Sequence, residues 1–446
     1  MSSTTDSREI ALDILMEILE KGGYSHLILR QALYKYQYLE KQERAFITRI
    51  VEGTLEYLIQ LDYCIDSYSK VKVHKMKPVI RTLLRMSVYQ ILYMDRIPDS
   101  AVCNEAVKLA VKRKFHGLKG FVNGVLRTIV REKDSITWPN DSIRYALPSW
   151  LFSMWEQDYG KERAAVMAAA FLEKKKTSVH LHVNQASRNE IIKSLEAQGV
   201  RVLPSGFAED MVYLESYDYL ESLDAFSNGW IQVQDASSSL AGRAAAPKAG
   251  DQIIDVCGAP GGKSIYLAEQ LKGTGMVEVR DLTEYKISLI DENILRTGLT
   301  NMKSKVWDAR VLDPEAVEQA DIVIADLPCS GLGIIGRKPD IKNRITSDQL
   351  KELAKLQREI LSVVQRYVKP GGKLIYSTCT IDRLENEENR TWFLNEYPFE
   401  PENLQGELGD VIQETTLKDG YVQLLPGVHP CDGFFIAAFR KKQNEQ

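Results

Sequence analysis

Residues 253–264 read Ile253-Ile254-Asp255-Val256-Cys257-Gly258-Ala259-Pro260-Gly261-Gly262-Lys263-Ser264, an apolar run followed by a glycine-rich turn. The apolar run predicts the end of a β-strand, and the residues from Ser264 onward predict a helix. Open α/β sheets bind ligands in the crevice at such strand-to-helix turns. Glycines let the backbone approach a ligand closely, and the following helix offers free N–H groups. The stretch therefore predicts a ligand site in a parallel sheet that has helices on both faces.

The spacing of the glycines indicates which class of cofactor the turn could bind. A phosphate-binding P-loop needs a glycine at position 257, which is a cysteine, and the glycines of this turn lack the dinucleotide-binding spacing. A nucleoside cofactor without a phosphate chain remains, and S-adenosylmethionine fits. Asp281 ends the second predicted strand, where it would bond the ribose hydroxyls, with Glu278 as the alternative. Asp308 ends the third strand and would reach the adenine amino group. Surface carboxylates beside a tight turn would give the same sequence.

The chain from about residue 230 onward alternates strand and helix patterns, which favours a Rossmann-like α/β domain. The predicted strands are 252–256, 276–280, 303–306, 321–325 and 372–377. The predicted helices are 263–271, 284–297, 346–368 and 385–396. Apolar runs at 421–425 and 433–439 predict a closing hairpin that is antiparallel to the sheet.

The amino-terminal part has the periodicity of helices. Apolar residues recur at helical spacing from Leu12 to Leu19 and from Ile80 to Leu92, so residues 7–134 predict an all-α bundle. After a break at Trp138, helices to about residue 173, a strand-like alternation over 178–184 and a helix over 190–198 predict a small α+β (RRM-like) module. The predicted domains are therefore 1–140, 141–230 and 231–446.

Charge is unevenly distributed over the 446 residues, although the net charge is only −4. Between Lys108 and Lys133 there are eight lysines and arginines against one acid, Glu132. A second basic stretch runs from Lys70 to Arg85. Such clusters on a nearly neutral protein are typical of phosphate binding, and a solvated helix face would give the same pattern.

The six cysteines are scattered, with no Cys-x-x-Cys pair and no histidine at zinc-ligand spacing. This argues against a disulfide scaffold and a structural zinc, and favours a reducing compartment. The first residues lack the features of a signal peptide. No apolar run approaches the ~20 residues that span a bilayer. We therefore expect a soluble, cytoplasmic protein with no metal and no membrane partner.

Two cysteines follow predicted parallel strands and would face one pocket: Cys329, in Asp326-Leu327-Pro328-Cys329, and Cys379, in Tyr376-Ser377-Thr378-Cys379. Carbon 5 of cytosine is a poor nucleophile. A thiolate that adds to carbon 6 converts the ring to an enamine, which can attack a sulfonium methyl. A base must then remove the carbon-5 proton before the thiol leaves. A single free cysteine is usually a small buried hydrophobe, and we expect this of Cys64, Cys103 and Cys431.

These motifs resemble the RNA 5-methylcytosine methyltransferases, and the amino-terminal segment ending in residues 120–127 resembles the antitermination factor NusB. The pairing is similar to the bacterial Sun/Fmu (RsmB) family, which methylates the 16S rRNA cytosine numbered 967. One departure is Leu181-His182-Val183-Asn184, where the family often has Leu-Arg-Val-Asn. The motifs that carry the resemblance are residues 234–238, 255–264, 326–333, 337–342, 376–380 and 385–389.

The resemblance implies roles for particular residues. Cys379 would be the nucleophile, Cys329 would assist product release, and Asp326 would lie beside the cofactor's methyl end and the target amino group. The implied cofactor-binding residues are Cys257, Gly258, Ala259, Pro260, Gly261, Gly262, Lys263, Asp281, Asp308 and Asp326. Lys263 and Arg337 are both candidates to lower the pKa of Cys379.

The expected partner is 16S rRNA, unassembled or partly assembled, bound by a monomer. The residues expected to contact RNA are Lys112, Arg113, Lys114, Lys119, Arg337 and Lys338.

Three alternatives stay open. A P-loop-like nucleotide triphosphatase would use residues 322–326 as a magnesium-binding strand end. A non-catalytic transcription or ribosome-assembly factor would use the NusB-like part alone. A methyltransferase of the same chemistry could act on another ribosomal RNA cytosine or on a transfer RNA.

Overall fold

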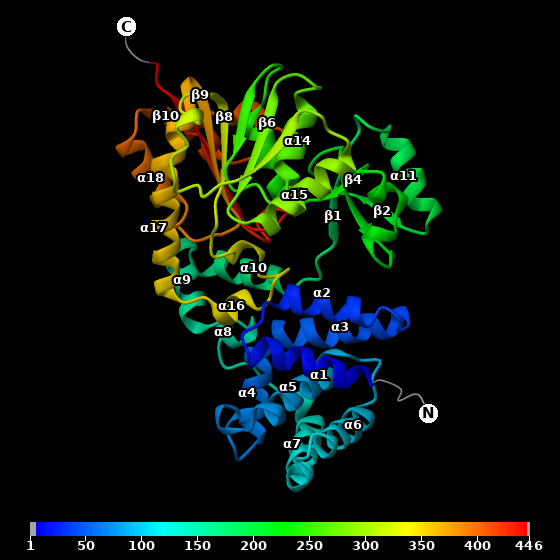
Figure 1. The fold of residues 1–446 in the computed structure, drawn as a ribbon. Coiled ribbons are helices and arrows are strands. Elements are labelled where there is room, and N and C mark those ends of the chain that lie inside the picture. The colour runs from blue at the N-terminus through cyan, green and yellow to red at the C-terminus, as the bar shows by residue number, and fades with distance from the viewer. Residues whose placement is uncertain (1–5, 444–446) are drawn as a thin grey trace. The chain divides into compact units, whose positions relative to one another are not determined.

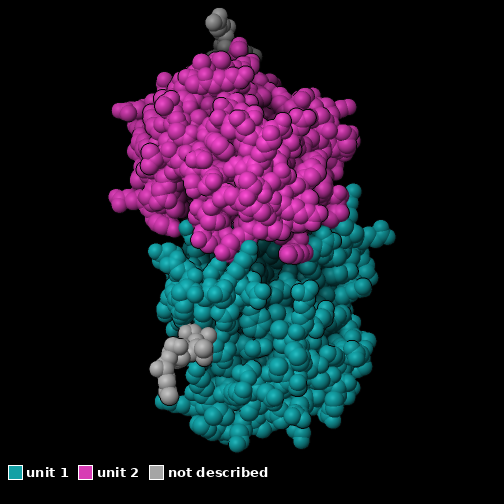
Figure 2. All heavy atoms as spheres, turned by 90° about the vertical axis from the view of Figure 1, so that its right-hand side faces the viewer, with its two compact units in different colours: residues 1–173, 335–344 teal, residues 174–334, 345–446 magenta. Residues whose placement is uncertain are grey.

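The computed structural model describes residues 6–443. The chain forms two compact units (Figure 2). Unit 1 consists of residues 1–173 and 335–344, and unit 2 consists of residues 174–334 and 345–446. None of the described helices combines the length and the apolar character needed to cross a membrane.

Unit 1 is helical, as the periodicity predicts. Apolar side chains such as Leu15 on α1 and Leu83 on α5 have no exposed surface, and they pack into one shared core. The bundle is confirmed, and the last helix comes from a distant segment, 335–344. The α-helices of this unit are α1 (Ser7–Leu19), α2 (Ser25–Lys35), α3 (Lys41–Glu56), α4 (Leu58–Tyr68), α5 (Pro78–Tyr93), α6 (Asp99–Lys112), α7 (Lys119–Glu132), α8 (Asp141–Arg144), α9 (Ser149–Tyr159), α10 (Lys161–Phe171) and α16 (Ile341–Arg344).

A small antiparallel sheet opens unit 2, in the strand order β2-β3-β1-β4. Its strands are β1 (Thr177–Leu181), β2 (Arg201–Pro204), β3 (Met211–Glu215) and β4 (Ile231–Val233). Helices α11 (Arg188–Ala197) and α12 (Asp224–Ser227) accompany it. The predicted strand over 178–184 ends earlier, at Leu181, because Ser187 begins α11 with a capping box to Glu190 and the chain must turn first.

The large sheet of unit 2 is mixed, in the order β10-β12-β9-β8-β5-β6-β7, with β11 paired to β12. Strands β5 to β9 pair in parallel, and the closing hairpin adds antiparallel strands at one side, as expected. The strands are β5 (Gln252–Asp255), β6 (Met276–Asp281), β7 (Met302–Val306), β8 (Ala320–Asp326), β9 (Val368–Thr378), β10 (Phe399–Pro401), β11 (Tyr421–Leu424) and β12 (Phe434–Lys441).

Helices cover both faces of this sheet (Figure 1). Ile265 of α14 and Ile290 of α15 share one core with the strands, whereas Leu361 of α17 and Phe393 of α18 share another. This is the three-layer arrangement that the alternating pattern predicts. The α-helices are α13 (Ala236–Ala245), α14 (Gly262–Gln270), α15 (Glu284–Thr297), α17 (Ser347–Val364), α18 (Glu387–Glu396) and α19 (Gln405–Leu408).

Strand register brings the sequence motifs to one edge. Asp255 at the end of β5 pairs with Ile324 of β8, and Asp326 at the end of β8 pairs with Ser377 of β9. Parallel strands end on the same side of a sheet, so the loops that follow them are neighbours.

Candidate active site

The two motif cysteines meet beyond the ends of β8 and β9. Asp326 lies opposite Ser377 in the parallel pair, and Cys329 and Cys379 follow within three residues. The two Sγ atoms are 3.3 Å apart. The structure therefore brings together the two thiols that the sequence places 50 residues apart.

Backbone contacts hold the two cysteine loops together. The Gly333 N–H donates to the Cys379 carbonyl over 3.0 Å, and the Gly433 N–H donates to the Gly333 carbonyl over 2.9 Å. A Cβ atom added to Gly333 would lie 2.0 Å from the Gly433 carbonyl oxygen. Only glycine fits at position 333, and its absence of a side chain keeps the thiols in contact.

A buried polar network fixes the residues next to each cysteine. The Glu385 carboxylate accepts hydrogen bonds from the Ser330 N–H (3.0 Å) and from the Gln357 side-chain amide (2.8 Å). The Ser330 and Thr380 hydroxyls lie 2.7 Å apart. Burial raises the pKa of Glu385, and the hydrogen bonds from its partners oppose that effect. Glu385 belongs to the motif at residues 385–389, but the sequence predicts no role for it, because its hydrogen-bond partners come from three separate segments.

Asp326 and Lys263 form an ion pair beside the thiols. Lys263 Nζ lies 2.6 Å from Asp326 Oδ2, and the Ser377 hydroxyl donates to Asp326 Oδ1 over 2.7 Å. Burial by itself would lower the pKa of Lys263, but Asp326 outweighs burial and raises it. The Cys379 thiolate is among the charges that raise this pKa. Because such coupling is mutual, the Lys263 ammonium favours the thiolate of Cys379.

The thiol pair titrates as a unit. The hydrogen bond with Cys379, followed by burial, raises the pKa of Cys329 well above its ordinary value. Two adjacent thiols resist losing both protons, since the second thiolate would face the first at short range. At neutral pH Cys329 therefore keeps its proton when Cys379 is ionised.

The glycine-rich turn connects β5 to α14. A Cβ atom on Gly258 would lie 2.4 Å from Val279 Cγ1 and 2.8 Å from Asp255 Oδ2. Gly261 has a φ of +106° and caps α14, where a residue with a side chain would be strained. The turn therefore needs its glycines for packing and for backbone conformation as well as for any ligand. The Cys257 side chain packs against the core that Leu361 and Phe393 share, and burial raises the pKa of its thiol.

The predicted cofactor carboxylates have different surroundings. Asp281 lies against the turn, because its Oδ2 accepts from the Ala259 N–H over 3.1 Å. Asp308 is paired with Arg310 over 2.7 Å, and the hydrogen bonds from Arg310 lower its pKa. Glu278, the alternative to Asp281, lies in ion pairs with Arg280 and Lys303.

The residues predicted to contact RNA all belong to unit 1. Lys112 is paired with Glu9, and Arg113 lies 2.7 Å from Asp13. Lys114 and Lys119 are exposed on the same basic stretch. Acidic side chains of α1 therefore neutralise part of the positive charge that the sequence shows.

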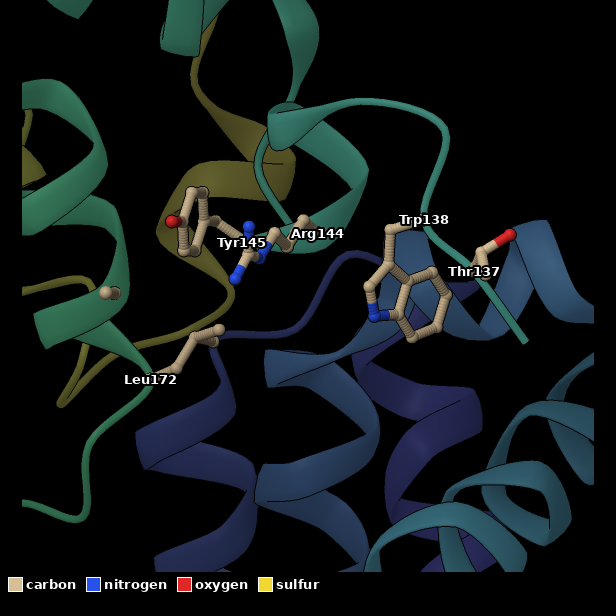
Figure 3. A pocket seen from close by; sticks show the side chains of 6 residues that line it. Thr137, Trp138, Arg144, Tyr145 and Leu172 are labelled. Atoms are coloured by element: carbon tan, nitrogen blue, oxygen red, sulfur yellow. The ribbon is translucent and has the colours of Figure 1, made fainter. Parts of the chain in front are cut away.

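Unit 1 also contains a cavity of about 570 Å³ (Figure 3). Its lining side chains include no carboxylate, thiol or imidazole. The lining residues are Thr137, Trp138, Arg144, Tyr145, Ala169 and Leu172.

Comparison with known proteins adds to this geometry. The family profile described as 16S rRNA methyltransferase RsmB/F matches residues 243–440. The chain is 39% identical, over 98% of its length and 99% of the relative's, to the probable ribosomal RNA small subunit methyltransferase B of Bacillus subtilis. The chain belongs to the RsmB/F family. The ribosomal RNA small subunit methyltransferase B of Cronobacter sakazakii is 32% identical over 99% of this chain and 100% of its own.

The other profiles match the remaining parts of this RsmB/F protein. The NusB family profile matches residues 5–131, and the RsmF/B-like ferredoxin-like domain profile matches residues 147–218. These matches confirm the NusB-like helical domain and the small α+β module. The methyltransferase match leaves the nucleotide triphosphatase alternative without support.

Solved structures agree with the fold of the RsmB/F chain. The structure of PH0851 is similar with a TM-score of 0.82 and 27% identity, over 98% of this chain and 99% of that one. The structure of NSun6 from Pyrococcus horikoshii with SFG has a TM-score of 0.59 over 67% of this chain and 100% of that one. Its 22% identity shows a shared fold alone.

Proposed function

We propose that this RsmB/F protein transfers the methyl group of S-adenosylmethionine to carbon 5 of a cytosine in 16S rRNA, the cytosine numbered 967, through a transient bond between Cys379 and the base. The observation that carries the proposal is the 3.3 Å contact between the Cys329 and Cys379 sulfurs beside the Lys263–Asp326 ion pair. Enzymes that methylate an exocyclic amine need no thiol at this place, whereas a carbon nucleophile must be generated by covalent addition.

The first step uses Cys379 as the nucleophile. Its thiolate, favoured by the Lys263 ammonium, forms a bond to carbon 6 of the base, and the electron pair of the 5,6 double bond moves to carbon 5. Carbon 5 then takes the methyl group, and the electrons of the broken sulfur–methyl bond stay on the departing sulfur. Asp326 is placed by Lys263 and Ser377 to accept a hydrogen bond from the base's amino group.

The second step uses Cys329 as the base. Cys379 is the first cause of the raised pKa of Cys329, so bonding the Cys379 sulfur to carbon 6 removes that cause and leaves burial as the main one. Cys329 then loses its proton to solvent and can take the proton from carbon 5. The freed electron pair restores the double bond, and Cys379 leaves as a thiolate. One proton is released in total, which balances the loss of the sulfonium charge.

The described residues fit the cofactor. S-adenosylmethionine supplies an activated methyl on a cationic sulfur. The turn offers backbone N–H groups at the start of α14 and close backbone approach at Gly258. Asp281 supplies a carboxylate beside the turn for the ribose hydroxyls. Asp308 can reach an adenine amino group only by releasing Arg310. The SFG-bound NSun6 structure supports a ligand site in this fold.

Replacing each thiol separately tests the mechanism. Cys379→Ala should abolish methyl transfer to a 16S rRNA fragment, because no adduct can form. Cys329→Ala should accumulate a protein–RNA adduct that survives denaturing electrophoresis, since the carbon-5 proton is no longer removed. Cys103→Ala, in the core of unit 1, is the matched control and should form product without accumulating adduct. Normal turnover of Cys329→Ala without an adduct would overturn the two-thiol assignment.

The target base needs its own experiment. Bisulfite sequencing of ribosomal and transfer RNA from cells that lack this protein should show loss of one 5-methylcytosine, at position 967 of 16S rRNA. Loss at another ribosomal or transfer RNA cytosine would keep the chemistry and change the substrate. Unchanged RNA together with no turnover in vitro would favour the non-catalytic alternative.

A further inference from the structure

A buried cluster of donor atoms joins the small sheet to the methyltransferase sheet within unit 2. His180 lies on β1, His182 follows it, and Glu269 lies near the end of α14. The three residues are 3%, 1% and 4% exposed. Each offers one ligand atom, and these atoms all lie within 4.8 Å of one another. None of the three has a part in the proposed methyl transfer.

Local structure explains why the two histidines face the same way. Residues two apart in an extended chain point to the same side, so the side chains of His180, on β1, and of His182, one residue beyond its end, face the same way. Their ring centroids are 5.2 Å apart. The backbone of His182 is held by a hydrogen bond from its N–H to the Trp230 carbonyl over 2.9 Å. Glu269 comes to this face from a helix that begins at Gly262, directly after the glycine-rich turn.

Several polar atoms of the cluster have no hydrogen-bond partner among the described residues. They are His180 Nδ1, both ring nitrogens of His182, and Glu269 Oε1. Two of these atoms, His182 Nδ1 and Glu269 Oε1, lie 2.6 Å apart and face each other as an ion pair. Buried polar groups are almost always satisfied, because leaving them unpaired costs free energy. That leaves His180 Nδ1 and His182 Nε2 with neither a hydrogen bond nor an ion pair among the described residues, and an imidazole nitrogen without a proton offers a lone pair to a metal ion.

A carboxylate orients the first histidine. His180 Nε2 lies 2.9 Å from Asp210 Oδ2. The proton on that nitrogen donates to Asp210, which leaves the Nδ1 lone pair directed to the cluster. Histidine ligands of metals usually have their second nitrogen bonded to a carboxylate in this way.

We propose that His180, His182 and Glu269 bind a divalent transition-metal ion, most suitably zinc, and that the ion ties β1 to α14. Two imidazoles and a carboxylate form a zinc-binding donor set. Tetrahedral zinc places its ligand atoms ~3.4 Å apart, so the 2.6 Å approach of His182 Nδ1 to Glu269 Oε1 must widen, and any ligand atoms that lie farther apart must close, to admit the ion. The ion would fix the small sheet to the helix that carries Lys263, independently of the proposed methyl transfer.

The rival explanation is a metal-free ion pair between protonated His182 and Glu269. Such a pair would use one nitrogen of His182 and would leave His180 Nδ1 and His182 Nε2 buried without a hydrogen-bond partner among the described residues. The other titratable groups of the surroundings are Tyr266, whose ring contacts His180, and Asp210. The two explanations differ in metal content, which can be measured directly.

The experiment uses the full chain, purified without a histidine tag and without chelators. Elemental analysis should find about one zinc ion per chain. After removal of the metal, added Zn²⁺ should restore that stoichiometry and raise the thermal midpoint of the apoprotein. Co²⁺ should give the visible absorption bands of a tetrahedral site. Absence of a resident ion, together with no binding of Zn²⁺ or Co²⁺ by the folded apoprotein, would overturn the proposal in favour of the ion pair.

Substitutions locate the site. His182→Gln and Glu269→Gln should each lose the ion, and Asp210→Asn should weaken binding by about 10- to 100-fold, because it releases His180. His429→Gln is the matched control: His429 lies 3.2 Å from Glu414 without a second histidine, so its removal should leave zinc binding unchanged. Equal loss in the control, or no loss in His182→Gln, would contradict the site. If a variant fails to fold, the wild-type titration still decides.

Discussion

At the scale of single residues, one lysine links the proposed cofactor turn to the proposed nucleophile. Lys263 is 12% exposed, pairs with Asp326 over 2.6 Å and interacts with the Cys379 thiolate. A cation held in such a place lowers the cost of a thiolate, and the partner carboxylate prevents the lysine from losing its proton. Arg337, the other candidate from the sequence, belongs to unit 1.

Lys263→Met should make Cys379 less reactive. Without the ammonium, the thiolate loses the cation that interacts with it, so the pH profile of Cys379 alkylation should move upward by about one pH unit or more. Methyl transfer at neutral pH should fall by about 10-fold or more for the same reason. Site-specific alkylation by iodoacetamide, followed by mass spectrometry across pH, measures the shift.

Lys373→Met is the control for this prediction. Lys373 is also 12% exposed and also pairs with a carboxylate, Glu402, but it lies in the middle of β9, six residues before Cys379. An alkylation profile that moves equally in both variants would mean that general loss of stability, and not the local charge, causes the effect.

At the scale of elements, the site depends on how the loops after β8 and β9 contact each other. Gly333→Ala would place a methyl group 2.0 Å from the Gly433 carbonyl oxygen. The loops must then separate, which costs ~1–3 kcal/mol in stability. Their separation also moves the two thiols apart. We expect most methyl transfer to be lost, together with tight binding of an arsenical that bridges two neighbouring thiols. Gly406→Ala, which adds its Cβ to open space, should change neither.

Strand β5 ends in a carboxyl group that should make stability depend on pH. Burial raises the pKa of Asp255 to about 6, against about 3.9 in an unfolded chain. The folded state therefore binds more protons between these values, so this group's contribution is complete below about pH 4 and is lost as the pH rises through 6. The loss amounts to about 3 kcal/mol.

Urea unfolding at several pH values checks this sign. Asp255→Asn cannot lose a proton, so its stability relative to the wild type should rise by about 3 kcal/mol between pH 4 and pH 7. Asp348→Asn, with a side chain that is 85% exposed, should follow the wild type at every pH. A wild-type stability that rises more steeply with pH than that of Asp255→Asn would contradict the assignment.

At the scale of the whole molecule, the net charge of −4 does not indicate which part of the chain would bind RNA. The basic stretch is in unit 1, but Lys112 and Arg113 are paired with acids of α1. Segment 335–344 also belongs to this unit, where Asp340 accepts from the Ser25 N–H over 3.2 Å and Lys342 Nζ donates to the Glu56 carbonyl over 2.8 Å. All six predicted RNA contacts therefore lie in one unit.

Salt dependence of RNA binding tests this distribution. The double variant Lys114→Ala/Lys119→Ala should bind the 16S rRNA fragment more weakly and reduce the slope of log affinity against log salt by about 1–2, because phosphate contacts are lost. Lys112→Ala should have a smaller effect, since Glu9 already neutralises that side chain. Lys351→Ala/Lys355→Ala on α17 is the control, and an equal change of slope there would contradict an RNA site in unit 1.

Local sequence determined the elements and the motifs. The helix over 284–297 has the predicted ends, and the parallel strands lie within a few residues of their predictions, because apolar periodicity and turn residues act over short distances. The strands of the small sheet were mostly missed because three to five residues carry too little pattern. The family was already visible in the motifs, and the comparisons confirmed it.

Tertiary structure alone decided which side chains meet. Strand register brought Cys329 next to Cys379. Packing formed the ion pairs Lys263–Asp326, Arg310–Asp308 and Arg113–Asp13. The expectation of no metal rested on spacing along the chain and stays a prediction; the proposed zinc site, which would overturn it, needs Glu269 to reach the two histidines from another element. Pairings between distant segments depend on sheet register and helix packing, and burial then sets the pKa values, so no local pattern encodes them.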